Sequence, residues 1–207
     1  MTDPLQLDAF MDAVIFAAQK HQGQVRKDEQ ASPYVTHPLA VARTLYTLGN
    51  INDTAILIAA VLHDTIEDTN TSETEIREIF GEEILSIVLE LTDDKSLKKM
   101  TRKQNQVNHA SELSWKAKTI KLGDKLTNCQ DILQSPPKNW TIDRRQEYIQ
   151  WAADVVAQIR GTNPHLEAVF DEMLVEAEKS LNFTIEPIET LNNRPWGFDT
   201  HLKHATE

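Results

Sequence analysis

The segment at residues 54–64 combines an unbroken apolar run with an abrupt polar end. Residues 56–62 read Ile-Leu-Ile-Ala-Ala-Val-Leu, and His63 and Asp64 follow them directly. Asp53, just before the run, is a residue type that caps helix N-termini. A helix that is apolar on all sides has to be buried. This segment therefore predicts a central helix that delivers metal-capable side chains to the edge of the core.

Apolar residues recur at the 3.6-residue spacing of amphipathic helices along most of the chain. Helix boundaries are marked by an N-cap at Thr36, by a capping-box pattern at Ser72 and Glu75, and by Gly81. The helix that reaches Arg160 begins at either Thr141 or Asp143. The predicted helices cover residues 5–21, 37–48, 54–64, 73–80, 84–91, 100–109, 114–133, 143–160 and 164–180. No alternating strand pattern competes with them, so the predicted fold class is all-α.

The length of 207 residues suits one helical domain with an appendage. We expect a helical bundle over residues 1–181 and an irregular tail over residues 182–207, where Pro, Asn and Gly interrupt the helical pattern. Two polar loops are predicted, at residues 24–35 and 135–139. Phe183, Trp196 and Phe198 suggest that the tail docks on the protein. The tail could cover the active site, mediate self-association into a homo-oligomer, or do neither.

Composition narrows the cellular setting and the partners. The single cysteine, Cys129, excludes an intramolecular disulfide and suits a reducing compartment. No run of about 18 apolar residues and no basic signal-peptide start are found, so we expect a cytoplasmic protein without a membrane segment. The formal net charge of −11 argues against a general nucleic-acid or anionic-membrane surface.

Positive charge is nevertheless concentrated in one part of the chain. Between Lys95 and Lys125 lie nine basic residues and two acidic ones, Glu112 and Asp124. Such a run is often a solvated helix face. The alternative is a basic wall beside a metal, which would attract a small polyphosphate anion.

His37, His63, Asp64 and Asp124 form a plausible ligand set for a divalent metal ion. Both His63 and Asp64 can reach one ion only if it lies where the helix ends, since adjacent helical residues point about 100° apart. Taken singly, each has a structural explanation: a backbone-bonded His37, a core His63, or an ion pair between Asp124 and a neighbouring lysine. Mixed imidazole and carboxylate ligands favour Mn²⁺, Fe²⁺, Co²⁺, Ni²⁺ or Zn²⁺ over Ca²⁺.

The same residues indicate hydrolysis of a phosphate ester. Four protein ligands leave positions open on an octahedral ion, where water can be deprotonated near neutral pH. Glu67 lies four residues after His63, on the same side one turn later. Glu67 and Asp68 are therefore candidate general bases.

Five motifs in this order and spacing resemble the HD-type hydrolase domain of RelA/SpoT homologues, and most of all the small stand-alone alarmone hydrolases, which include a metazoan branch. The likeness spans residues 5–178 and excludes the tail. The motifs are His-Gln-Gly-Gln-Val-Arg-Lys at 21–27, Pro-Tyr-Val-Thr-His-Pro-Leu at 33–39, Leu-His-Asp-Thr-Ile-Glu-Asp at 62–68, Leu-Thr-Asp-Asp-Lys at 91–95 and Lys-Leu-Gly-Asp-Lys-Leu-Thr-Asn at 121–128.

The resemblance implies an all-α enzyme that uses one Mn²⁺. Such an enzyme would act on alarmones, the nucleotides of the stringent response. It would hydrolyse guanosine 3′,5′-bis(diphosphate) and its pentaphosphate relative to GDP or GTP plus pyrophosphate. The implied metal ligands are His37, His63, Asp64 and Asp124, and the implied catalytic pair is Glu67 and Asp68. The implied substrate-binding residues are Arg26, Lys27, Tyr34, Lys95, Lys99, Asn128, Arg144 and Tyr148.

Three other functions stay open on the sequence. The same site could remove the 2′-phosphate of NADPH or act on another nucleotide. A binding module that senses the alarmone without cleaving it is a second alternative, although such a sensor would not need Glu67 and Asp68. A purely structural helical protein is the third, and five ordered motifs argue against it.

Overall fold

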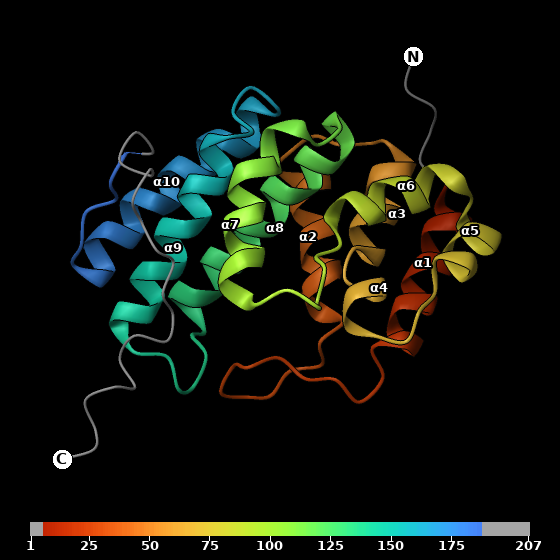
Figure 1. Ribbon diagram of the computed structural model, residues 1–207, viewed down its shortest axis with the longest axis horizontal. Helices are drawn as coiled ribbons and strands as arrows, with labels where there is room; N and C mark the ends of the chain where they lie inside the picture. Colours follow the sequence, from red (N-terminus) through yellow and green to blue (C-terminus); the bar gives the residue numbers. More distant parts are fainter. Residues whose placement is uncertain (1–5, 188–207) are drawn as a thin grey trace.

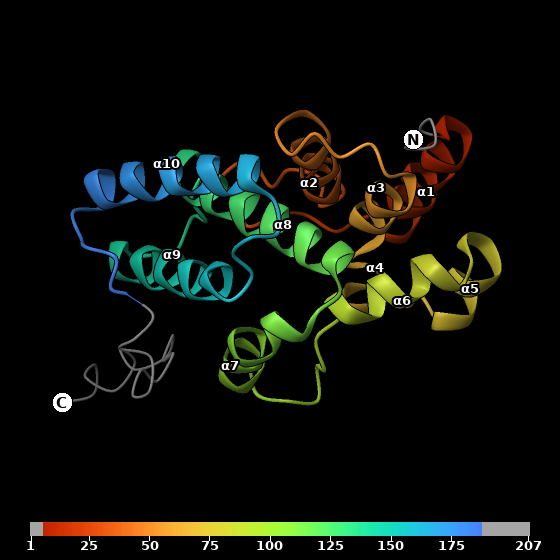
Figure 2. The ribbon, with the colours of Figure 1, turned by 90° about the horizontal axis from the view of Figure 1, so that it is seen from above.

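The computed structural model describes residues 6–187, and within this range the protein is built from helices. Figures 1 and 2 show them as a bundle in which α8 runs through the middle and α3 lies among α1, α2, α6 and α8. The helices are α1 (Leu7–Lys20), α2 (Thr36–Thr47), α3 (Thr54–Leu62), α4 (Thr65–Asp68), α5 (Glu73–Phe80), α6 (Glu82–Leu91), α7 (Lys99–His109), the short 3-10 helix η1 (Ala110–Glu112), α8 (Trp115–Gln134), α9 (Ile142–Ala157) and α10 (Pro164–Leu181). The all-α prediction is confirmed, and the described residues contain no strand beyond a single bridge between Val25 and Pro33.

Helix α3 is the buried centre that its apolar sequence predicts. Every residue at positions 56–62 is buried, and α3 packs against α1, α2, α6 and α8. The Asp53 side chain accepts the Ile56 backbone N–H and caps the helix, as predicted. Burying a large aliphatic side chain contributes roughly 1.5–3 kcal/mol. This core therefore fixes where the chain emerges at His63.

The helix predicted over residues 54–64 ends earlier than expected. It stops at Leu62, the chain turns through His63 and Asp64, and α4 starts at Thr65. The Thr65 hydroxyl donates to the Leu62 carbonyl at 2.7 Å, which closes the turn. His63 and Asp64 therefore lie on a corner between two helices.

Other boundaries were predicted from caps, with two errors. The capping box of Ser72 and Glu75 is present, and Thr141 rather than Asp143 caps α9. The end of α9 was predicted at Arg160 but lies at Ala157, where the chain leaves the helix in a turn. Thr36 was wrong as an N-cap because it is the first residue of α2 and its hydroxyl donates to the Pro33 carbonyl instead.

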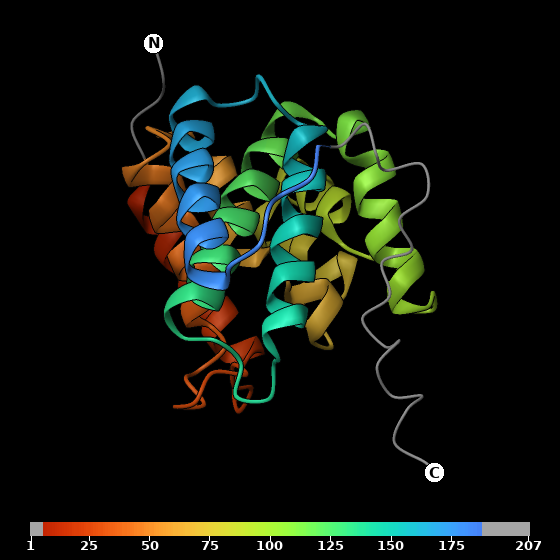
Figure 3. The ribbon, with the colours of Figure 1, turned by 90° about the vertical axis from the view of Figure 1, so that its left-hand side faces the viewer.

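Only the first part of the predicted tail lies within the described residues. After α10, Phe183 and Ile185 pack against the core, and the Gln150 side chain bonds both the N–H and the carbonyl of Glu186. Figure 3 shows this segment running back beside α9. Trp196 and Phe198 and the open roles of the tail fall outside the described residues.

None of the helices in the described range is long and apolar enough to cross a lipid bilayer.

Candidate active site

Three helical segments bring the predicted metal ligands together. His37 is the second residue of α2, His63 lies at the corner after α3, and Asp124 lies within α8. One ligand atom from each of these residues lies within 4.8 Å of the others. His37 and His63 are buried, and Asp124 is largely so. Residues 87 positions apart thus form one cluster because α2 and α8 pack side by side.

Asp64 completes the cluster from the same corner. Its Oδ2 lies 3.2 Å from His63 Nε2 and 3.9 Å from His37 Nε2. Asp124 Oδ1 lies 3.1 Å from His37 Nε2 and 3.8 Å from His63 Nε2. Two carboxylates and two imidazoles therefore lie around one small space, although only His37, His63 and Asp124 have ligand atoms that all lie within 4.8 Å of one another.

The surrounding bonds suit a metal ion. His63 Nδ1 lies 2.7 Å from the Ala60 carbonyl oxygen, an acceptor only, so this nitrogen carries the proton. The Nε2 lone pair then faces the carboxylates, which is the arrangement of metal-binding histidines. In the neutral imidazole that lone pair repels the carboxylate oxygens, so the cluster needs a proton or a cation between these atoms. The donor set therefore fits a divalent metal ion.

Local charge keeps both carboxylates ionised. Burial raises the pKa of Asp124, but Lys125 at 2.8 Å and positive charge on His37 and His63 outweigh burial and hold that pKa well below its usual range. Burial also raises the pKa of Asp64, yet positive charge on His63 and His37 leaves that pKa lowered overall. Ionised carboxylates are the forms that bind metals.

The two candidate bases occupy different surroundings. Glu67 is partly buried and lines the cavity described below, where burial raises its pKa. Asp68 accepts a hydrogen bond from Tyr34 Oη at 3.3 Å and forms an ion pair with Lys95. Asp68 is not among the residues that line the cavity within the described range. The geometry thus separates two carboxylates that the sequence placed in one role.

A cavity of about 390 Å³ opens on the cluster. Figures 1 and 3 show the segments 21–35 and 135–141 at the same end of the bundle, and the Lys138 N–H donates to the Lys27 carbonyl between them. Basic side chains line much of the cavity and form a basic wall, and one of them, Lys125, pairs with the cluster residue Asp124. The basic wall consists of Arg26, Lys27, Lys99, Arg102, Lys103, Lys121 and Lys125.

Six of the eight predicted substrate-binding residues line the cavity: Arg26, Lys27, Tyr34, Lys99, Asn128 and Tyr148. Three of these six also contact acidic side chains, since Asn128 donates to Asp124, Arg26 pairs with Asp131 and Tyr34 donates to Asp64, each at 2.6 Å. Lys95 and Arg144 are not among the residues that line the cavity. Lys95 pairs with Asp68, and Arg144 lies over the Trp140 ring.

Trp151, Lys103 and Lys125 were not predicted from the sequence as site residues, although all three line the cavity. The Trp151 ring has Lys103 Nζ 3.6 Å from its centroid and Lys125 Nζ 4.5 Å away, and Tyr148 packs against it. Burial and nearby cations lower the pKa of Lys103 well below its usual range. The lysines belong to the basic run found in the sequence, but a tryptophan in an amphipathic helix gives no local signal of facing a cavity.

Lys121 and Arg102 were also missed as cavity residues. Burial, with Lys125 nearby, lowers the pKa of Lys121 to about 8. Arg102 pairs with Glu67 at 3.2 Å. Tertiary packing, and not sequence spacing alone, decides that the helix faces carrying Lys121 and Arg102 turn toward the cavity.

Comparison with known proteins identifies relatives of this chain. A family model described as an HD domain matches residues 13–153. The Xenopus tropicalis protein named guanosine-3′,5′-bis(diphosphate) 3′-pyrophosphohydrolase MESH1 is 51% identical over 166 residues, which are 80% of this chain and 93% of that protein. The Homo sapiens protein of the same name is 46% identical, over 76% of this chain and 88% of its own length.

A solved structure gives the same result for the fold. It is described as a metazoan ortholog of SpoT that hydrolyzes ppGpp, and it superposes with a TM-score of 0.80 at 43% identity, covering 85% of this chain and 98% of its own. The resemblance predicted from the five motifs is confirmed by these matches. The chain belongs to the HD domain family and, within it, to the MESH1-like group.

Proposed function

We propose that the protein is a guanosine 3′,5′-bis(diphosphate) 3′-pyrophosphohydrolase. It cleaves the tetraphosphate to GDP plus pyrophosphate and the pentaphosphate to GTP plus pyrophosphate. One observation carries the proposal: the His-Asp cluster and a basic wall share one cavity. The names of the MESH1 relatives support the same substrate.

His37, His63, Asp64 and Asp124 would hold one divalent ion, which we propose to be Mn²⁺. The mixed nitrogen and oxygen donors suit this choice. When bound, such an ion supplies Lewis acidity toward a phosphoryl oxygen and favours the deprotonation of water. Asn128 and Lys125 hold Asp124, and Tyr34 holds Asp64, so the ligand carboxylates keep fixed orientations.

Glu67 takes the proton from the attacking water in this proposal. It faces the cavity and its raised pKa suits proton transfer nearer neutral pH. The water oxygen bonds to phosphorus and the bond from that phosphorus to the 3′-oxygen breaks. The 3′-oxygen takes up a proton to become the 3′-hydroxyl of the nucleotide, and pyrophosphate is released. Asp68 acts indirectly, because it holds Tyr34 and Lys95.

The basic side chains bind the negative substrate. Arg26, Lys27 and Lys99 would contact phosphate oxygens, since charge-assisted hydrogen bonds to phosphate are strong. Tyr148 offers an aromatic surface beside them. We assign this activity to residues 1–181 and none of it to the tail.

Purified protein loaded with Mn²⁺ and incubated with guanosine 3′,5′-bis(diphosphate) tests the proposal. Anion-exchange chromatography should show GDP and pyrophosphate, and a chelator should stop their formation. Asp64→Ala should lose both turnover and bound metal. Arg43→Ala, on an exposed part of α2, is the matched control and should keep both.

Intact guanosine tetraphosphate with metal bound would refute the proposal. Release of phosphate from NADPH in the same preparation would then favour the alternative phosphatase function.

A further inference from the structure

Glu67 is held by both of its carboxylate oxygens. Arg102 Nη1 lies 3.2 Å from Oε1, and the Asp93 backbone N–H donates to Oε2 at 3.1 Å. A carboxylate bonded at both oxygens has one preferred orientation, whereas a free glutamate samples several rotamers. The two partners come from outside α4, from α7 and from the segment that precedes it.

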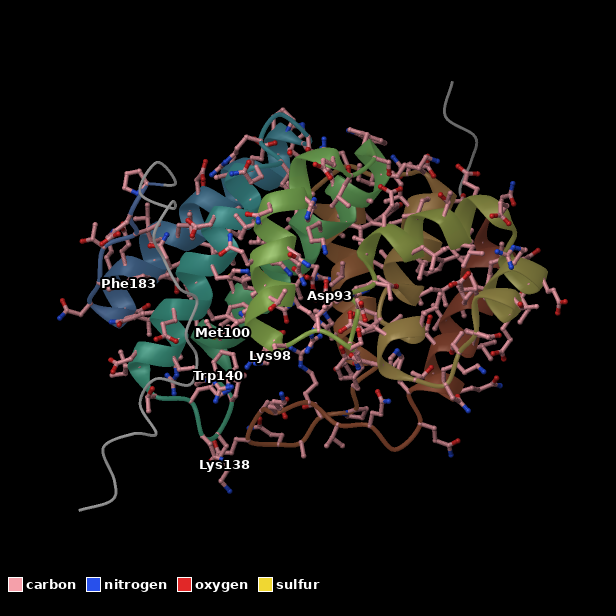
Figure 4. All side chains as sticks on the ribbon, viewed as in Figure 1. Asp93, Lys98, Met100, Lys138, Trp140 and Phe183 are labelled. Carbon is pink, nitrogen blue, oxygen red and sulfur yellow. The ribbon has the colours of Figure 1, made fainter. Side chains whose placement is uncertain are left out.

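Helix α7 reaches Glu67 by a second route as well. Gln106 lies four residues after Arg102 and therefore on the same face of α7. Its side-chain amide donates to Asp93 Oδ2 at 2.8 Å, and Arg102 Nη1 lies 3.9 Å from the same oxygen. Figure 4 shows Asp93 lying beside α7. Gln106 thus fixes the residue whose backbone N–H fixes Glu67.

The charges around Glu67 give Arg102 a reason to be there. Asp64, Asp68 and Asp93 all repel a carboxylate at this position, and burial disfavours its ionised form too. The Arg102 guanidinium is permanently charged and has a direct bond to Glu67, so it opposes this repulsion.

We propose that Arg102 and Gln106 are positioning residues, through which α7 orients Glu67 toward the attacking water. This inference rests on the proposed function for its kinetic consequences. Its structural content, a single Glu67 orientation that depends on α7, stands independently of the substrate. Neither residue acts on the substrate in this proposal.

Crystal structures of the wild type and of Arg102→Gln test the structural content. The wild type should show one Glu67 conformer within bonding distance of the Asp93 N–H. The variant should show Glu67 displaced or in several rotamers. An unmoved, single-conformer Glu67 in the variant overturns the proposal whatever the protein hydrolyses.

Kinetics with guanosine 3′,5′-bis(diphosphate) test the consequence. We expect Arg102→Gln to lower kcat about 10- to 100-fold with KM changed less than about 3-fold, since a small misplacement of a reacting group has effects of this size. Arg102→Lys should restore part of the rate. Gln106→Leu should have a smaller effect because it acts through Asp93. Arg43→Gln, an exposed arginine of α2, is the control.

A double-mutant cycle separates positioning from a general structural role. In a Glu67→Gln background, Arg102→Gln should cause little further loss of kcat, because the group that it positions is already gone. Additive losses, or a raised KM with kcat intact, would refute positioning and make Arg102 a substrate contact. A wild type that leaves the substrate intact would refute the proposed function, while the crystal structures still decide the positioning role.

Discussion

Gly123 is the position where the packing of the site makes the sharpest stability prediction. It lies inside α8, next to Asp124. A Cβ added there would meet Leu45 Cδ2 at 2.7 Å and Leu45 Cγ at 3.1 Å. Leu45 belongs to α2 and is completely buried. The absent side chain lets α2 and α8 approach closely, and this approach brings His37 to Asp124.

The magnitude for Gly123→Ala follows from two opposing effects. Replacing a glycine inside a helix by alanine stabilises that helix by about 1 kcal/mol. Overpacking a filled core costs about 1–3 kcal/mol. The expected net change is a destabilisation of roughly 0–2 kcal/mol, which corresponds to a drop in Tm of about 2–4 °C per kcal/mol for a chain of this size.

Urea unfolding followed by circular dichroism measures this change. Gly123→Ala should lower the midpoint without changing the slope. Combining it with Leu45→Ala provides the control, because that variant opens a cavity into which the new methyl group fits. The double variant should be more stable than the sum of the single effects predicts, by about 1 kcal/mol. A Gly123→Ala protein more stable than the wild type by about 1 kcal/mol would refute close packing at this site.

Two further predictions concern the cap of α3 and the support of the metal ligands. Burial raises the pKa of Asp53, but Lys116 and the Ile56 N–H outweigh burial and lower that pKa overall. The unfolded chain therefore binds this proton more readily, and the Lys116 pairing stabilises the fold above about pH 4 and is lost as the pH falls through the folded-state pKa. Asp53→Asn should keep the cap, so its free energy of unfolding should differ from that of the wild type only above that pH. Asp53→Ala should in addition lose about 1 kcal/mol from the missing cap. Equal urea midpoints for the two variants would contradict the cap. Tyr34→Phe removes the hydrogen bond to Asp64 and should weaken Mn²⁺ binding about 10- to 100-fold in titration calorimetry; unchanged affinity would show that this bond does not support the site.

The sequence alone determined the features that depend on neighbours along the chain. The capping box at Ser72 and the Asp53 cap involve contacts within four residues, so residue type and spacing reveal them. The apolar run of α3 is visible in the sequence because seven consecutive residues are apolar. The identity of the metal-binding candidates was also available, because His63 and Asp64 stand at the polar end of a buried helix. The end of α3 at Leu62 could not be predicted in the same way. The turn that follows is closed by the Thr65 hydroxyl, and threonines also occur inside helices, so this residue type does not mark a turn.

Only the tertiary structure decided which distant residues meet and which face of each helix lines the cavity. Glu67 and Asp68 are adjacent in sequence, yet one faces the cavity beside Arg102 and the other is held by Tyr34 and Lys95. Such pairings join positions roughly 30 residues apart, and their geometry depends on how closely helices pack. Close packing is set by the combined shapes of side chains from several helices, as Gly123 shows, and no local pattern records it.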